Sequence, residues 1–304
     1  MPSEAPAEGS PKVALSTTGM RRLDGGRFLM GSESPESWPA DGEGPVREVE
    51  LRPFWMDACA VTNRQFLEFV TATRYRTEAE EFGWSFVHFS QLTPHQRKTL
   101  APFRVQGLEW WFRVDGATWR RPHGTGVDIE RLKRWDHPVV HVSHRDAAAY
   151  AAWAGKRLPT EAEWEYASRG GLTGKRYPWG DELMPDKKHR CNIWQGNFPT
   201  IDRGEDGFRG TAPVRTYKPN GFGLYQMTGN VWEWVADWFS PHHPRDRVLR
   251  DPRGPATGDR RVMRGGSHLC HDSYCNRYRC SARTSNTPDS STGHMGFRCA
   301  ADAD

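Results

Sequence analysis

The spacing of apolar positions along the chain predicts three helices, over residues 62–74, 143–155 and 160–171. Each begins with a hydroxyl side chain that can cap the first turn, namely Thr62, Ser143 and Thr160. In the second and third helices an acid follows three positions after the cap, Asp146 and Glu163, and this spacing is typical of a capping box. A glycine ends both of these helices, so the sequence defines their bounds on each side.

Short apolar runs, and apolar residues that alternate with polar ones, predict strands. Four such segments lie at residues 47–57, 137–143, 261–267 and 295–300. They do not alternate with long helices, which argues against a doubly wound parallel sheet. Because 30 glycines and 22 prolines interrupt nearly every stretch, we expect an α+β protein with little regular secondary structure. No change of composition marks a linker, so one domain is expected over residues 19–304, after a disordered leader at residues 1–18.

The balance of charge narrows the classes of partner. The 304 residues include 42 basic and 38 acidic side chains, intermixed along the chain, which gives a net charge of +4. Without a basic block or a basic helix, nucleic-acid binding is not expected. Residues 1–18 lack the apolar core of a secretory signal, and no apolar run reaches the length of a membrane span. We therefore expect a cytoplasmic protein that binds neither nucleic acid nor membrane.

Cysteines recur every five residues near the C-terminus, at Cys270, Cys275 and Cys280. In a strand, an odd separation sends Cys270 and Cys275 to opposite faces, and in a helix they lie about 140° apart. The two sulfurs can therefore meet only if the backbone bends, and residues 271–273, His-Asp-Ser, tolerate a bend. A structural disulfide is one alternative. A zinc site that adds Cys280 and Cys299 is another, although no pair shows the close Cys-x2-Cys spacing.

Amide and carboxylate side chains and tight glycine turns fill the irregular stretch of residues 174–262. Hard divalent cations such as calcium bind this kind of flexible, oxygen-rich shell. The spacing does not match an EF-hand loop, so ordinary Asx turns are the interpretation favoured by the pattern alone.

Two further patterns have structural explanations that the sequence favours. His137 and His141 are four residues apart, as in some helical metal sites, but Pro138 and the neighbouring valines predict the start of a strand. Both are therefore expected to be structural histidines. Trp110 and Trp111 are suited to flank a groove for an extended, proline-containing peptide, yet core packing is the favoured role.

The order of several motifs resembles that of the sulfatase-modifying-factor superfamily between residues 19 and 301. Among these motifs are "GGRFLMGS", "WAGKRLPTEAEWEYASRGG", "GNVWEWVADW" and "GFRCA". Within that superfamily, the formylglycine-generating enzymes carry two active-site cysteines in a segment similar to "GGSHLCHDSYCNRYRC", residues 265–280. Cys270 and Cys275 occupy those two positions. The resemblance implies a single irregular domain distantly similar to C-type lectins.

The resemblance also implies a reaction and its partners. Molecular oxygen would oxidise the cysteine of a Cys-x-Pro-x-Arg motif, in an unfolded segment of a sulfatase, to Cα-formylglycine, and a thiol reductant would take part. Two converging thiolates are soft ligands that select Cu(I), so the expected enzyme is a copper-dependent oxidoreductase of sulfatase maturation. A non-catalytic lectin-like binding module is an alternative function. An oxidase of the same superfamily that acts on another thiol substrate is a second.

The resemblance assigns roles to five residues around the thiols. Cys270 and Cys275 would hold copper. Ser267 and Tyr274 match residues that line the oxygen or copper pocket. Trp232, the first tryptophan of "NVWEW", matches a tryptophan beside the copper centre, where a large apolar wall would exclude bulk water.

Two calcium sites are implied in the same way. The ligands of the first would be the side chains of Asn192 and Asp206 and the backbone oxygens of Ile193 and Phe208. The ligands of the second would be the side chains of Gln226 and Glu233 and the backbone oxygens of Gly229 and Val231. Relatives commonly have asparagine where this chain has Gln226, and the longer amide is expected to supply its oxygen at some cost in geometry.

One departure from the superfamily pattern concerns disulfides. Relatives in the secretory pathway pair the cysteines that match Cys280 and Cys299 with partners in the second and third helices. Here those partner positions are Ala151 and Ser168, which agrees with a reducing cytosol. We expect Cys280 and Cys299 to be free buried thiols.

Overall fold

The computed structural model describes residues 15–244 and 247–303, and these contain five α-helices. They are α1 (Asn63–Thr73), α2 (Glu78–Phe82), α3 (Pro94–Thr99), α4 (His144–Trp153) and α5 (Glu161–Arg169). Short 3-10 helices span Pro39–Asp41, Phe89–Gln91, Ala101–Phe103 and Pro185–Lys187. In the described ranges, no helix combines the length and the apolar character needed to cross a membrane. Of the predicted leader, residues 1–14 lie outside the described residues.

The three predicted helices are confirmed as α1, α4 and α5, and their N-caps explain where they begin. The Ser143 hydroxyl accepts a hydrogen bond from the Asp146 N–H (3.1 Å), and the Asp146 carboxylate accepts one from the Ser143 N–H (2.9 Å). Helices α1 and α5 begin with the same reciprocal pair. The sequence did not indicate α2 and α3, because five and six residues are too few to show an apolar stripe.

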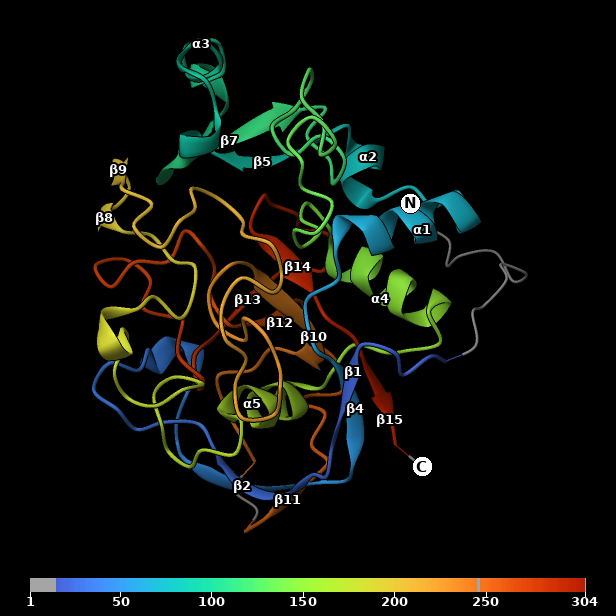
Figure 1. Cartoon of the computed structure of the whole chain (residues 1–304), viewed down its shortest axis with the longest axis vertical. Coiled ribbons are helices and arrows are strands. Elements are labelled where there is room, and N and C mark those ends of the chain that lie inside the picture. The colour runs from blue at the N-terminus through green and yellow to red at the C-terminus, as the bar shows by residue number, and fades with distance from the viewer. Residues whose placement is uncertain (1–14, 245–246, 304) are drawn as a thin grey trace.

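Strands form five small sheets within the described ranges. The sheet in the middle of the molecule (Figure 1) has the order β13 (Arg283–Asn286), β12 (Arg261–Arg264), β10 (Trp232–Trp238) and β14 (Met295–Phe297). A second sheet has the order β1 (Met20–Leu23), β4 (Phe54–Asp57) and β15 (Ala300–Asp302). A third has the order β11 (Leu249–Arg250), β3 (Arg47–Leu51) and β2 (Gly26–Met30).

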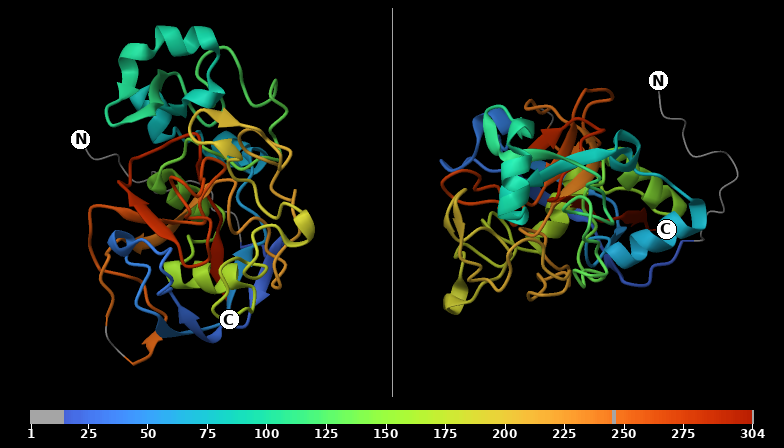
Figure 2. Two further views of the ribbon diagram at one scale, coloured as in Figure 1. Left: turned by 90° about the vertical axis from the view of Figure 1, so that its left-hand side faces the viewer. Right: turned by 90° about the horizontal axis from the view of Figure 1, so that it is seen from above.

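The remaining two sheets lie at one end of the molecule. One has the order β5 (Trp84–His88), β7 (Leu108–Asp115) and β6 (Arg104–Val105), and together with α3 it projects from the body, as Figure 2 shows. The other is the hairpin of β8 (Gly196–Asn197) and β9 (Ile201–Asp202). The two lie side by side, since the ring of Trp110 in β7 is 5.5 Å from that of Phe198 in the hairpin turn.

Three of the four predicted strand segments contain strands. Residues 261–267 contain β12, and residues 295–300 contain β14. Residues 47–57 form two strands, β3 and β4, which belong to different sheets. The break falls at Pro53, because proline has no N–H with which to continue a ladder.

The predicted strand at residues 137–143 is wrong. The segment is largely buried, but its only pairing among the described residues is an isolated bridge at Pro138. His141 has a φ of 58°, a left-handed conformation that interrupts an extended run. Its ring lies 2.8 Å from the Ser85 hydroxyl and 2.9 Å from the Pro122 carbonyl oxygen. The backbone still bonds to separate partners, as in the hydrogen bonds from the Val139 N–H to the Val61 carbonyl oxygen (2.9 Å) and from the His141 N–H to the Thr292 carbonyl oxygen (2.9 Å), but no regular ladder forms.

A buried cluster of ion pairs joins α5 to the central sheet. Arg264, at the end of β12, is fully buried and pairs with Glu161 (3.2 Å) and Glu165 (2.5 Å) of α5. Its guanidinium also donates to the carbonyl oxygen of Cys280 (2.8 Å). We call residues 265–280 the cysteine loop. Arg264 directly precedes this loop and bonds to its last residue, so one side chain fixes both ends.

Candidate active site

The cysteine loop brings Cys270 and Cys275 together. Their sulfur atoms lie 2.8 Å apart, and both are free thiols. The bend between them falls at residues 271–274, where the Cys275 N–H donates to the His271 carbonyl oxygen (2.6 Å). Both cysteines are buried. The structure therefore contains the bend that a five-residue spacing requires.

A glycine fixes the path of the loop at its base. Gly266 has a φ of 71°, and a Cβ atom there would lie 2.9 Å from the Arg277 carbonyl oxygen. Real Cβ atoms do not approach a backbone oxygen so closely, so only glycine lets the two ends of the cysteine loop cross here. Because Arg264 also bonds to the Cys280 carbonyl oxygen at the end of the loop, the loop has little freedom to open.

The two thiols differ electrostatically. The hydrogen bond from Cys270 lowers the pKa of Cys275 to about 7, and the positive charge of Arg277 acts in the same direction. Burial, and then the contact with Cys275, raises the pKa of Cys270 well above its ordinary value. Arg277 is itself held by Asp41, whose carboxylate accepts from its Nε (2.5 Å). Ionisation of the pair therefore begins at Cys275, while Cys270 keeps its proton.

Alkylation should report this thiolate. We expect the rate of Cys275 alkylation by iodoacetamide, followed by peptide mapping, to rise as the pH increases through a midpoint near the pKa of about 7, because only the thiolate reacts. Arg277→Gln should move the midpoint upward. Cys191, whose pKa is raised by burial, should stay unmodified in the folded protein. A midpoint at the ordinary thiol pKa of about 8.5 would contradict the assignment.

Both cysteines line a cleft of about 390 Å³. Ser267, Tyr274 and Trp232 line the same cleft, although Trp232 comes from β10 and the others from the cysteine loop. The Ser267 N–H donates to the Cys270 sulfur (3.4 Å). All five residues that the sequence placed around the thiols are thus brought together.

Aromatic rings form one wall of this cleft. Trp110 and Trp111 line it, so the core packing favoured by the sequence is wrong for both, and β7 buries Phe112 in their place. Trp110 packs edge-on against Tyr274 (5.1 Å), and Phe198 stacks on Tyr274 at 4.6 Å with 9° between the planes. Sequence reasoning missed Phe198, because nothing in its local pattern indicates that it faces the cysteine loop.

The residues of the first predicted calcium site surround a buried carboxylate. Asp206 is 9% exposed, burial raises its pKa, and no described lysine or arginine forms an ion pair with it. The Gln195 amide nitrogen donates both to the Ile193 carbonyl oxygen and to Asp206 Oδ2 (2.8 Å), so these two oxygens face one position. Of the other two predicted ligands, Phe208 donates its N–H to Asp206 Oδ1 (3.0 Å), and the Asn192 amide nitrogen donates to the Gly210 carbonyl oxygen (2.8 Å). A buried carboxylate that has hydrogen-bond donors but no cationic partner, beside a converging carbonyl oxygen, fits a hard cation such as calcium.

The second predicted calcium set does not fit a cation. Glu233 accepts hydrogen bonds from Arg298 through both carboxylate oxygens (2.7 and 2.8 Å), so its charge is already neutralised within the protein. Gln226 keeps a buried side-chain oxygen without a partner. That amide oxygen and the carbonyls of Gly229 and Val231 carry no negative charge, which leaves the set without the carboxylate that calcium needs.

Cys280, Cys299 and His137 have surroundings that indicate structural roles. Cys280 and Cys299 are fully buried free thiols, as expected of a chain without the secretory disulfides. Across the described parts of the chain, no three His, Cys, Asp or Glu side chains gather to hold a metal, which argues against the zinc alternative. His137 Nδ1 lies 2.9 Å from the Thr211 hydroxyl, so it too has a structural partner.

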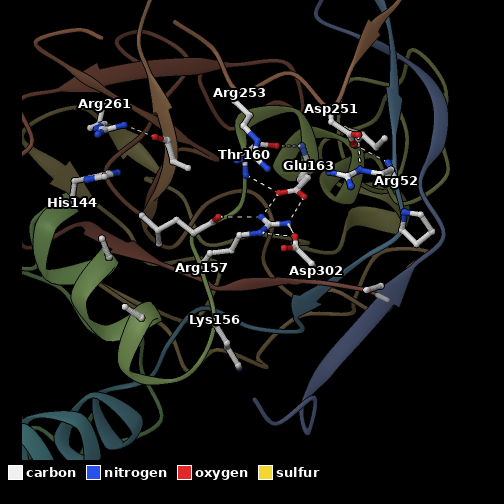
Figure 3. Close-up of a pocket in the computed structure, with 17 residues that line it drawn as sticks. Arg52, His144, Lys156, Arg157, Thr160, Glu163, Asp251, Arg253, Arg261 and Asp302 are labelled. Carbon is white, nitrogen blue, oxygen red and sulfur yellow. Dashed lines mark hydrogen bonds and ion pairs between the residues drawn. The ribbon is translucent and has the colours of Figure 1, made fainter. Parts of the chain in front are cut away.

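A larger pocket, of about 650 Å³, lies elsewhere, against α4, α5 and β15 (Figure 3). Its walls carry many charges, but these are largely paired with one another. Arg157 bonds Glu163 and Asp302 (2.7 Å each), and Arg52 bonds Asp251 (2.7 Å). None of its lining residues is a cysteine or a predicted site residue. Pocket size therefore does not locate the chemistry, and the thiol cleft is the candidate active site.

Similarity to known proteins extends over nearly the whole chain. Residues 6–303 match the family described as "Sulfatase-modifying factor enzyme 1-like domain". The chain is 57% identical over 303 residues to a "Formylglycine-generating enzyme" from Streptomyces coelicolor, covering 100% of this chain and 95% of that protein. A protein of the same name from Thermomonospora curvata is 59% identical over 289 residues, 93% of each. PvdO from Pseudomonas aeruginosa shares the fold with a TM-score of 0.65 at 24% identity, covering 93% of this chain and 94% of that one, which confirms the predicted fold class.

Proposed function

Because this chain belongs to the sulfatase-modifying factor enzyme 1-like family, we propose that it is a formylglycine-generating oxidase. It would convert the cysteine of a Cys-x-Pro-x-Arg motif, in an unfolded segment of a sulfatase, to Cα-formylglycine. The observation that supports this best is the contact between Cys270 and Cys275 inside a cleft. A lectin-like binding module would have no use for two buried thiols in contact inside a cleft.

The proposed reaction balances when a thiol reductant takes part. The client CH2–SH group, one O2 and two reductant thiols give an aldehyde, hydrogen sulfide, water and one reductant disulfide. The client carbon loses one C–H bond and its C–S bond and gains a C=O bond. Dioxygen takes up four electrons, of which two come from the client and two from the reductant.

Cys270 and Cys275 would hold Cu(I), since two soft sulfur donors in one cleft suit that ion. When bound, copper supplies the redox chemistry with dioxygen that side chains cannot perform. The protein's own groups prepare the site for it. Arg277 stabilises the thiolate on Cys275, the Ser267 N–H fixes the Cys270 sulfur, and buried Trp232 excludes bulk water.

The aromatic wall suits the client segment. Trp110, Phe198 and Tyr274 offer ring faces and edges on which an extended, proline-containing peptide can lie. None of the described residues that line the cleft is acidic. The client arginine follows the cysteine by four residues, about 13 Å in an extended chain. The client arginine would therefore extend beyond the cleft and pair with an acidic residue of this protein that lies outside it.

The proposal includes one structural calcium ion, at Asp206. Its further ligands would be the Asn192 side chain and the carbonyl oxygens of Ile193 and Phe208. The buried Asp206 carboxylate, which has no cationic partner among the described residues, supports this site, whereas the ion pair of Glu233 with Arg298 argues against a second.

Mass spectrometry of a client peptide tests the proposed function. A Cys-x-Pro-x-Arg peptide incubated with the protein, Cu(I), oxygen and a thiol reductant should lose about 18 Da, because oxygen replaces sulfur and two hydrogens are lost as the thiol becomes an aldehyde. The same peptide with serine for cysteine is the control and should keep its mass. An unchanged cysteine peptide, under conditions in which Cu(I) binds, would reject this activity. If the protein converts a different thiol peptide but not this one, it is instead an oxidase of the same superfamily with another thiol substrate.

A further inference from the structure

The loop that carries the proposed calcium ligands also supports both cysteines. We call residues 192–208 the oxygen-rich loop. The Trp194 N–H donates to the Cys270 carbonyl oxygen (3.0 Å). Phe198, from the same loop, stacks on Tyr274, which directly precedes Cys275. Each cysteine therefore has a contact of its own with the oxygen-rich loop, one through the backbone and one through a ring.

Asp206 braces the part of the loop that makes the backbone contact. Its Oδ2 accepts from the Ile193 N–H (3.1 Å) and from the Gln195 side chain (2.8 Å), the two residues that flank Trp194. In return, the Asp206 N–H donates to the Gln195 side-chain oxygen (3.2 Å). The buried carboxylate thus acts on both neighbours of the amide that holds Cys270.

A further backbone connection ties the start of the oxygen-rich loop to the cysteine loop. The Asn192 carbonyl oxygen accepts from the Asn230 N–H (2.8 Å), and the Asn230 carbonyl oxygen accepts from the His268 N–H (3.0 Å). His268 lies two residues before Cys270. Movement of the oxygen-rich loop would therefore be transmitted to the thiols at several points.

We propose that the oxygen-rich loop positions the two thiols through the Trp194 amide and the Phe198 ring, and that calcium bound at Asp206 favours disulfide formation between Cys270 and Cys275. This inference rests on the calcium site of the proposed function. Trp194 and Phe198 are positioning residues, because they act through Cys270 and Tyr274. A cation that joins Asp206 to the Ile193 carbonyl reduces the freedom of the loop. The sulfurs, already 2.8 Å apart, then lose less entropy when they bond.

The equilibrium between dithiol and disulfide can be measured against mixtures of oxidised and reduced dithiothreitol. The protein's two thiols give up two electrons and two protons, and one S–S bond forms between Cys270 and Cys275. The reagent takes up the same electrons and protons as its own S–S bond breaks. The measurement uses the full chain without copper, oxygen or client peptide.

Saturating Ca²⁺ should raise the equilibrium constant for disulfide formation about tenfold, which corresponds to a reduction potential about 30 mV more negative. Binding of Ca²⁺ itself is followed separately, as a rise in the thermal unfolding midpoint. A wild-type protein that binds Ca²⁺ without this redox response would overturn the inference, and so would one that does not bind Ca²⁺ at all.

Three variants test whether the effect of Ca²⁺ on the thiols depends on Asp206 and on the Phe198 ring. Phe198→Leu should keep the thermal response to Ca²⁺ while its redox response falls below about threefold, because the ring stack on Tyr274 is lost. Asp206→Asn should lose both responses. Glu205→Gln removes an equal charge from the adjacent residue, whose carboxylate is 53% exposed, and should keep both. A full redox response in Phe198→Leu, or loss of both responses in Glu205→Gln, would contradict the proposed route.

The outcome is independent of oxidase activity. A protein that makes no formylglycine but shows the calcium response would reject the proposed function and support this inference. Normal turnover and normal Ca²⁺ binding without a redox response would reject the inference alone.

Discussion

Cys275→Ser is expected to lower formylglycine formation by roughly 10³-fold or more, since it removes a group on which the proposed chemistry depends. A serine hydroxyl is not ionised near neutral pH and is a hard donor, so the variant loses both the thiolate and a soft ligand for Cu(I). Cys270→Ser should have an effect of similar size. Turnover is measured by mass spectrometry of the client peptide, and Cu(I) binding by competition with a chromophoric chelator.

Cys59→Ser provides the matched control for these variants. Cys59 is a free thiol that does not line the cleft, so its replacement should change neither turnover nor Cu(I) binding. Turnover that survives both Cys270→Ser and Cys275→Ser would show that the thiol pair is not the reaction centre. Loss of Cu(I) binding with retained turnover would reject the role of copper instead.

Arg264→Met should lower the free energy of unfolding by about 3 kcal/mol. The side chain is fully buried, and its loss removes ion pairs to Glu161 and Glu165 and a hydrogen bond to the Cys280 carbonyl oxygen. Methionine can fill part of the space but cannot satisfy any of these oxygens. Urea denaturation measures the change, and turnover should fall as well, because the cysteine loop is no longer closed at its base.

Arg250→Met tests whether burial of the ion pairs explains the loss of stability expected for Arg264→Met. Arg250 also pairs with a glutamate, Glu50 (3.3 Å), but its side chain is 76% exposed. Its replacement should change stability by less than about 1 kcal/mol. Equal losses in the two variants would mean that burial of the ion-pair cluster around Arg264 does not account for its contribution.

Patterns within a few residues of sequence predicted those elements whose stabilising contacts are made between residues close in the chain. The starts of α4 and α5 were readable because a capping box involves two residues three positions apart. The same reasoning failed at residues 137–143, where the left-handed backbone of His141 is held by Ser85 and Pro122. These partners are distant in the sequence, and no period within the segment reveals them.

For the candidate site, the sequence by itself determined which residues are proposed to carry the chemistry: the two cysteines, with a bend between them, and the motif that includes Ser267 and Tyr274. Only the tertiary structure decided how these groups are supported. It placed Phe198 on Tyr274, moved Trp110 from the expected core to the cleft, and paired Glu233 with Arg298. Such contacts depend on how separate loops close and pack, and that information is absent from the spacing of residues within any one segment.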